Sequence, residues 1–128
     1  MAYVLIVDDD EGFADAAAIA LKSHGYEVEV EPDIHAATAR MTGRRPDLLI
    51  LDVMFPEDSG AGFSLARAVH QDEKLKGMPV LMLTAINQRF PLGFSSRDID
   101  DDWLPVGEFL EKPVDLEVLA AKVRHLLA

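Results

Sequence analysis

Short apolar runs alternate with longer amphipathic segments along the whole chain. Runs of four apolar residues occupy 4–7, 48–51 and 80–83, and a shorter run occupies 109–110. A continuous apolar run of this length is typical of a strand covered on both faces. The segment 26–31 differs, because apolar and acidic residues alternate strictly in it. We therefore expect five strands, with 26–31 at an edge of the sheet.

The segments between these runs show the spacing of amphipathic helices. Helices are predicted over 11–24, over 34–43 with Asp33 as N-cap, around 63–74, and over 116–127 with Asp115 as N-cap. Strands that alternate with helices form a parallel sheet with helices on both faces. An edge position for 26–31 favours the doubly wound strand order 2-1-3-4-5, so we predict an α/β fold of this type.

Composition narrows the possible functions. The length of 128 residues fits a single domain spanning 1–128. Lys plus Arg number 12 and Asp plus Glu number 23, and the resulting charge of −11 disfavours binding to nucleic acid or to an anionic membrane. The absence of cysteine excludes disulfides, zinc–thiolate sites and cysteine nucleophiles. Neither a signal peptide nor an apolar membrane span is visible, so the expected compartment is the cytoplasm.

The polar residues that directly follow the apolar runs are the candidates for chemistry. Asp8, Asp9 and Asp10 follow the first predicted strand, Asp52 follows the third, Thr84 the fourth and, after Glu111, Lys112 the fifth. In open α/β sheets, ligands bind beyond the carboxyl ends of the strands, near the point where the strand order reverses. We therefore expect these carboxylates, the hydroxyl and the ammonium group to meet at one edge of the sheet.

Carboxylates gathered in this way repel one another and need a compensating cation. Hard oxygen ligands suit Mg²⁺, which usually keeps some of its waters. A lysine beside such a carboxylate would complement an incoming phosphoryl group, and a threonine hydroxyl can bond another phosphoryl oxygen. The pattern thus favours covalent chemistry on a carboxylate, with an aspartyl phosphate as the product.

Each of these residues taken alone has a simpler interpretation. An acidic run after a strand often favours only the positive end of the helix that follows it. Asp52 alone could be a loop carboxylate, Thr84 a strand-end residue bonded to backbone, and Lys112 a solvated surface lysine. Their coincidence at the strand ends of one topology favours the functional interpretation.

Four stretches, VLIVDDDEGF, DLLILDVMFPEDSG, PVLMLTA and FLEKPVD, resemble the receiver domain of two-component response regulators. The resemblance covers nearly the whole chain and implies a flavodoxin-like fold. It implies that Asp52 is the phosphoryl acceptor. It also implies that Asp8, Asp9, Asp52 and the backbone carbonyl of Met54 surround a Mg²⁺ ion, with Asp8 acting partly through water.

The same resemblance assigns roles near the last two strands and suggests partners. Thr84 would contact the phosphoryl group, Lys112 would pair with one of its oxygens, and Phe109 occupies the aromatic switch position. The phosphoryl donor would be a sensor histidine kinase or a phosphotransfer protein, in a step that the receiver itself largely catalyses. Phosphorylation would then alter the surface that binds a downstream protein target. The chain would be a monomer or a phosphorylation-dependent dimer.

Two alternatives remain open. A phosphatase of the haloacid dehalogenase type also uses an aspartate nucleophile after a strand, but it needs a second Asp two positions on, where this chain has Met54. A degenerate receiver would act as a binding scaffold without phosphorylation.

The segment 85–107 departs from the receiver pattern. Pro91 and Gly93 disfavour a helix near its start, and Pro105 and Gly107 interrupt its end. We predict that the usual fourth helix of the family is missing or shortened here, and that the segment is a partner-specific surface.

Overall fold

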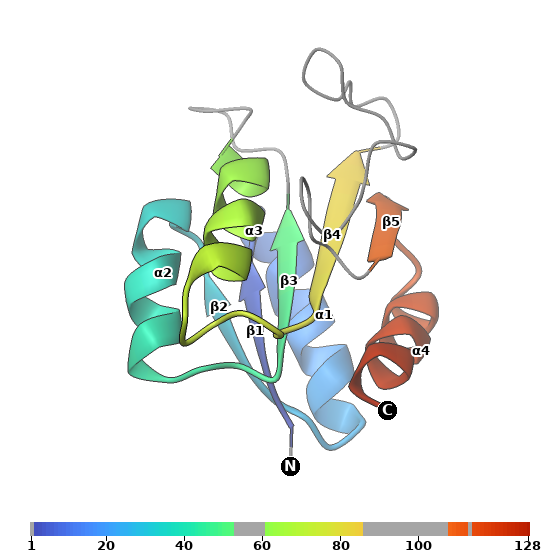
Figure 1. The fold of residues 1–128 in the computed structure, drawn as a ribbon. Coiled ribbons are helices and arrows are strands. Elements are labelled where there is room, and N and C mark those ends of the chain that lie inside the picture. The colour runs from blue at the N-terminus through green and yellow to red at the C-terminus, as the bar shows by residue number, and fades with distance from the viewer. Residues whose placement is uncertain (1, 53–60, 86–107, 113) are drawn as a thin grey trace.

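The computed structural model of the chain is a three-layer α/β structure, and it describes residues 2–52, 61–85, 108–112 and 114–128 (Figure 1). The strands are β1 (Tyr3–Val7), β2 (Glu27–Glu31), β3 (Leu48–Asp52), β4 (Val80–Ala85) and β5 (Glu108–Lys112). The helices are α1 (Glu11–Ser23), α2 (Ile34–Gly43), α3 (Ala61–Gln71) and α4 (Leu116–Leu127).

The five strands form one parallel sheet in the order β2-β1-β3-β4-β5, as the sequence predicted. The register places Val7 beside Leu51, and Asp52 beside Leu83. The central strands β1 and β3 are buried along their whole lengths, whereas β2 is largely half-exposed at the edge. The alternation of 26–31 was therefore a correct signal for an edge strand.

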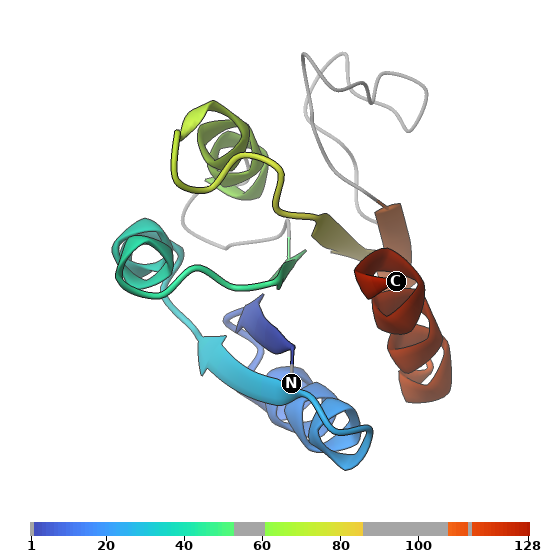
Figure 2. The same ribbon diagram turned by 60° about the horizontal axis from the view of Figure 1, so that its bottom comes forward.

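Two apolar clusters cover the two faces of the sheet. Helices α2 and α3 pack on one face and α1 and α4 on the other, as Figures 1 and 2 show from two directions. Side chains alternate along β1, so Leu5 joins the first cluster while Val4 and Ile6 join the second. The sheet is thereby held between two buried apolar layers, which fixes the positions of the strand ends.

Local signals set most element ends where the sequence placed them. The Asp33 carboxylate accepts a hydrogen bond from His35 N at 2.9 Å, and the Asp115 carboxylate accepts one from Glu117 N at 2.8 Å. Both are N-caps of the kind that satisfy the free amides of a first helical turn. Gly25 has φ of +92° directly after the end of α1, a conformation that favours glycine.

Several boundaries differ from the prediction, and among them α3 begins at Ala61 instead of near residue 63 and β2 begins at Glu27 instead of at residue 26. α3 ends at Gln71 instead of near residue 74, because Asp72 starts a turn: its carboxylate accepts from Lys74 N at 2.7 Å and its carbonyl from Lys76 N at 2.9 Å. β5 is longer than 109–110, since pairing with β4 extends to Lys112 opposite Ala85. His24 caps α1 instead of lying within it.

The prediction of a missing or shortened fourth helix falls on 85–107, nearly all of which lies outside the described residues.

The glutamates of the alternating segment pair with basic side chains of α2 and of the residue that directly follows it. Arg40 lies 3.1 Å from Glu31 and 3.7 Å from Glu29, and Arg44 forms a two-point ion pair with Glu27. The Arg44 guanidinium also stacks on the Tyr3 ring, 3.9 Å from its centroid. These contacts attach the edge strand to α2 through charge and stacking in addition to apolar packing.

Tyr3 gives this region a pH-dependent contribution to stability. Burial, together with the 2.5 Å hydrogen bond that its hydroxyl donates to Glu29, raises the pKa of Tyr3 from 10.0 to about 12. Because the phenol ionises more readily in the unfolded chain, its stabilising effect is complete below about pH 10 and is lost between about pH 10 and 12. Urea unfolding across this window should show the loss.

Tyr3→Phe should remove that part of the alkaline destabilisation, while Tyr26→Phe, the matched control, should keep it. An identical alkaline loss in the wild type and in Tyr3→Phe would show that Tyr3 is not its source.

Candidate functional site

Three aspartates meet at the carboxyl edge of the sheet. Asp8 and Asp9 directly follow β1, and Asp52 is the last residue of β3. One carboxylate oxygen from each of the three lies within 4.8 Å of the others. β1 and β3 are neighbours, and β2 lies on the other side of β1, so the cluster lies where the strand order reverses. This is the position at which doubly wound sheets place their ligands.

The backbone around Asp8 holds the first part of the cluster in place. Asp8 N donates to the carbonyl of Glu31 at 3.2 Å, which ties the end of β1 to the end of β2. The Asp8 carboxylate accepts from Asp10 N at 2.9 Å. The Asp8 side chain is therefore oriented by the turn that leads into α1.

The three consecutive aspartates have different surroundings. Asp8 is fully buried, Asp9 is exposed, and Asp10 is the N-cap of α1, with its carboxylate accepting from Phe13 N at 3.1 Å. The interpretation of the acidic run as a helix N-terminus is thus correct for Asp10, while Asp8 and Asp9 point to the cluster. The run of three aspartates thus supplies both two members of the acidic cluster and the N-cap of α1.

Asp52, like Asp8, is buried, which is unusual for an aspartate. Asp52 is only 4% exposed, and buried carboxylates are rare unless they have partners. Among the described residues, no buried side-chain oxygen or nitrogen lacks a hydrogen-bond partner. A buried, satisfied carboxylate next to two others forms a preorganised acidic site.

The other predicted site residues are placed only at the level of the backbone or not at all. Thr84 and Lys112 lie near the carboxyl ends of the adjacent strands β4 and β5, where Thr84 is in register with Glu111 and Ala85 with Lys112. Phe109 lies opposite Met82. The side chains of Thr84, Phe109 and Lys112, and the whole of Met54, lie outside the described part of the structure. The backbone thus brings Thr84 and Lys112 to the same edge as the aspartates.

The donor set of the cluster fits a small hard cation. Three carboxylate oxygens within 4.8 Å of one another present oxygen ligands only, and two of the three side chains are buried. Mg²⁺ prefers such ligands and accepts water at its remaining positions, for which the exposed Asp9 leaves access. The cation would offset the repulsion among the carboxylates.

A doubly wound sheet with an acidic cluster at its switch point defines a class of α/β domain, and comparison with known proteins specifies the family. The family model of the response regulator receiver domain matches residues 4–124. The chain therefore belongs to the receiver domain family of two-component response regulators, as its motifs indicated.

Individual relatives agree with this assignment. The chain is 37% identical to the DNA-binding dual master transcriptional regulator RpaA of Synechocystis, over 99% of this chain and 49% of that protein. It is 33% identical to the phosphate regulon transcriptional regulatory protein PhoB of Pseudomonas aeruginosa, over 97% of this chain and 51% of that protein. The chain thus spans about half the length of these relatives.

A solved structure also matches the whole fold. The chemotaxis response regulator CheY4 of Vibrio cholerae superimposes with a TM-score of 0.83 at 30% identity, covering 99% of both chains. No helix in the described ranges of our chain is long and apolar enough to cross a membrane.

Proposed function

We propose that this chain is a phosphorylation-dependent signalling switch that accepts a phosphoryl group on Asp52. The donor is a phosphohistidine on a sensor histidine kinase or a phosphotransfer protein. The observation that supports this most strongly is the cluster of Asp8, Asp9 and Asp52 at the switch point of the sheet.

Asp8, Asp9 and Asp52, with the backbone carbonyl of Met54, would hold Mg²⁺. When bound, the ion supplies charge neutralisation for phosphoryl oxygens at this edge. The three carboxylates would define the position of the ion, and they differ in burial. Buried Asp8 and Asp52 are fixed by the fold, and exposed Asp9 completes the set from the solvent side.

The chemical step is a displacement at phosphorus. A carboxylate oxygen of Asp52 forms the new P–O bond as the P–N bond to the donor imidazole breaks, and the electron pair of that bond stays on the imidazole. The product is an acyl phosphate. In our proposal the Lys112 ammonium pairs with a phosphoryl oxygen and the Thr84 hydroxyl bonds another, because β4 pairs with β3, β5 pairs with β4, and all three end at the same edge of the sheet.

Phosphorylation adds negative charge and acceptor oxygens at the ends of β3, β4 and β5. We propose that Thr84 and Phe109 respond to this change and shift the chain toward a state that binds a downstream protein. Residues 1–128 would act as one cytoplasmic receiver domain, monomeric or dimeric on phosphorylation. We also propose that the segment 85–107 is the partner-specific surface that this change alters.

Phosphotransfer from a small phosphodonor such as acetyl phosphate, followed by intact-mass measurement, tests the proposal. A single added phosphoryl group, dependent on Mg²⁺ and lost slowly, is the expected result. A scaffold without phosphorylation would show no added mass. A phosphatase would release phosphate continuously from phosphomonoesters.

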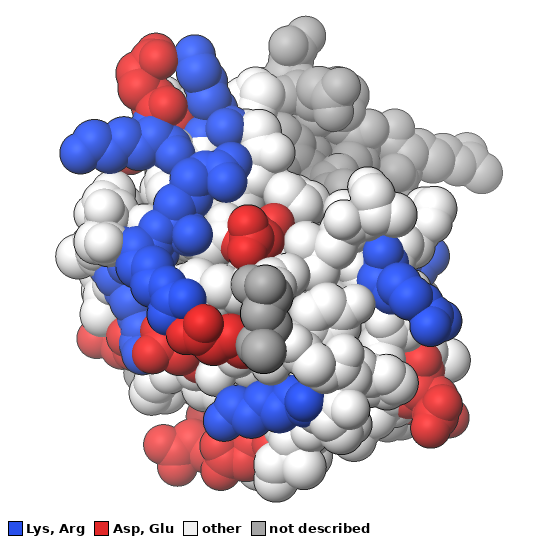
Figure 3. Space-filling model, turned by 90° about the horizontal axis from the view of Figure 1, so that it is seen from below, with Lys and Arg blue, Asp and Glu red and all other residues white. Residues whose placement is uncertain are grey.

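DNA binding is a further point on which the chain can be tested. We expect no sequence-specific binding, because the charge of −11 opposes the counterion release that drives such complexes. Basic side chains do gather on one side of the face seen in Figure 3, with acidic ones among them. Arg44 and Lys76, from the loops at the amino ends of β3 and β4, are paired with Glu27 and Glu73.

A gel-shift titration of this chain with promoter fragments should therefore show no complex at physiological salt. A salt-sensitive, sequence-specific shift would contradict the prediction. Arg45→Gln would then show whether the basic loops are responsible.

A further inference from the structure

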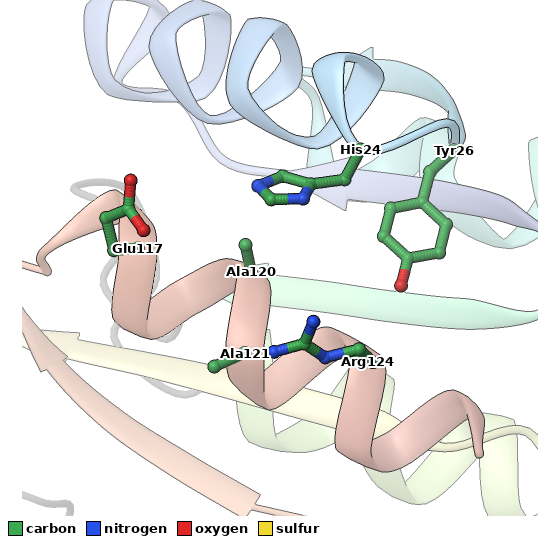
Figure 4. A pocket seen from close by; sticks show the side chains of 6 residues that line it. All are labelled: His24, Tyr26, Glu117, Ala120, Ala121 and Arg124. Atoms are coloured by element: carbon green, nitrogen blue, oxygen red, sulfur yellow. The ribbon is translucent and has the colours of Figure 1, made fainter.

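A polar pocket lies between the carboxyl end of α1 and helix α4. The acidic cluster lies at the opposite, amino end of α1. The pocket has a volume of about 260 Å³. It is lined by His24, Tyr26, Glu117, Ala120, Ala121 and Arg124. Figure 4 shows that His24 and Tyr26 reach it from the α1–β2 connection, and the other four residues from α4. The spacing 117, 120/121, 124 places one flank of α4 along the pocket.

The polar side chains that line this pocket form no ion pair or hydrogen bond with the described residues. Neither the Glu117 carboxylate nor the Arg124 guanidinium takes part in an ion pair in the described part of the chain. The Tyr26 hydroxyl and the His24 ring likewise have no hydrogen-bond partner among the described residues. Both charged side chains are exposed, so water solvates them until a ligand arrives.

The arrangement of charge indicates what such a ligand would carry. Arg124 is cationic, Glu117 is anionic, and Figure 4 shows them at different parts of the pocket wall, with Ala120 and Ala121 between them on α4. Tyr26 and His24 add hydrogen-bonding groups opposite α4. A lining with one group of each sign, separated by small apolar side chains, complements a molecule that itself bears both charges.

We propose that this pocket binds a small zwitterion of the amino-acid class. Its carboxylate bonds the Arg124 guanidinium and the Tyr26 hydroxyl, its ammonium group pairs with Glu117, and its carbon skeleton lies against Ala120 and Ala121. Arginine suits the first role because its planar fork matches a carboxylate. The volume of about 260 Å³ lies below the range of drug-sized sites and suits a molecule of this size.

Amide NMR spectra of the full chain, titrated with free L-amino acids one at a time, test the proposal. At least one amino acid should shift the amides of His24, Tyr26, Ala120 and Arg124 in a saturable way. Acetate and methylammonium, which each carry one half of the charge pattern, should bind at least about tenfold more weakly.

Arg124→Gln and Glu117→Gln should each weaken binding by about tenfold or more, since each removes one charged contact. Lys74→Gln and Glu73→Gln change the same charges at exposed positions on the α3–β4 loop and should leave binding unchanged. The proposal is overturned if no amino acid shifts the pocket amides, or if the loop variants weaken binding as much as the pocket variants. Acetate binding as tightly as an amino acid would indicate a simple anion site and would also overturn it.

Discussion

Asp52→Asn should abolish phosphoryl labelling by a small phosphodonor, a loss of at least about a hundredfold. The amide keeps the shape of the side chain but offers no anionic oxygen to attack phosphorus. Asp52 ends the central strand β3 and is only 4% exposed, so no other carboxylate of the cluster takes its place without moving the backbone. Intact-mass measurement after incubation with acetyl phosphate and Mg²⁺ gives the extent of labelling.

Two controls make this experiment decisive. Asp15→Asn changes an exposed aspartate on α1 and should label as the wild type does. Circular dichroism and cooperative thermal unfolding of Asp52→Asn should show that the fold is kept. If the folded variant still gains a phosphoryl group on another carboxylate, the assignment of Asp52 as acceptor is wrong.

The sheet was predictable because its determinants are local and periodic. Continuous apolar runs indicated the buried strands β1, β3 and β4, and the alternation in 26–31 indicated the edge strand β2. Once β2 was placed at the edge, few topologies remained, and the observed order is one of them. The positions of Asp8, Asp9 and Asp52 at one edge then follow from the parallel strand direction alone.

Features that depend on contacts between distant segments were not predictable. The pairing of Arg40 and Arg44 with the glutamates of β2 requires the packing of α2 against that strand, which periodicity does not specify. α3 ended early because one side chain, Asp72, competes for backbone amides. The lining of the α1–α4 pocket shows the same limit, since His24 has no spacing relation to Arg124 and gave no sequence signal.

The acidic run shows where sequence and structure must be combined. Three consecutive aspartates have the same chemistry, yet burial and hydrogen bonding separate a buried residue of the cluster, an exposed one, and a helix cap. The sequence indicated the cap as the alternative explanation for the whole run. The structure shows that this explanation applies to Asp10.

Asp9→Ala should consequently affect mainly metal affinity, and Asp10→Ala mainly stability. Loss of the Asp9 carboxylate leaves an incomplete set of ligands, so Mg²⁺ affinity should fall by at least about tenfold to a hundredfold, the range found even for residues that only support a ligand. Stability in the absence of metal should stay the same or rise, because one of three mutually repelling carboxylates is gone.

Asp10→Ala should instead cost about 1 kcal/mol of stability, because the bond to Phe13 N that caps α1 is lost. Its effect on Mg²⁺ affinity should be a factor of a few at most, since only a neighbouring charge is removed. Calorimetric titration with MgCl₂ and urea unfolding of both variants measure the two quantities on the same protein. Equal Mg²⁺ affinities for the wild type and Asp9→Ala, or a larger loss in Asp10→Ala, would show that Asp9 is not a ligand.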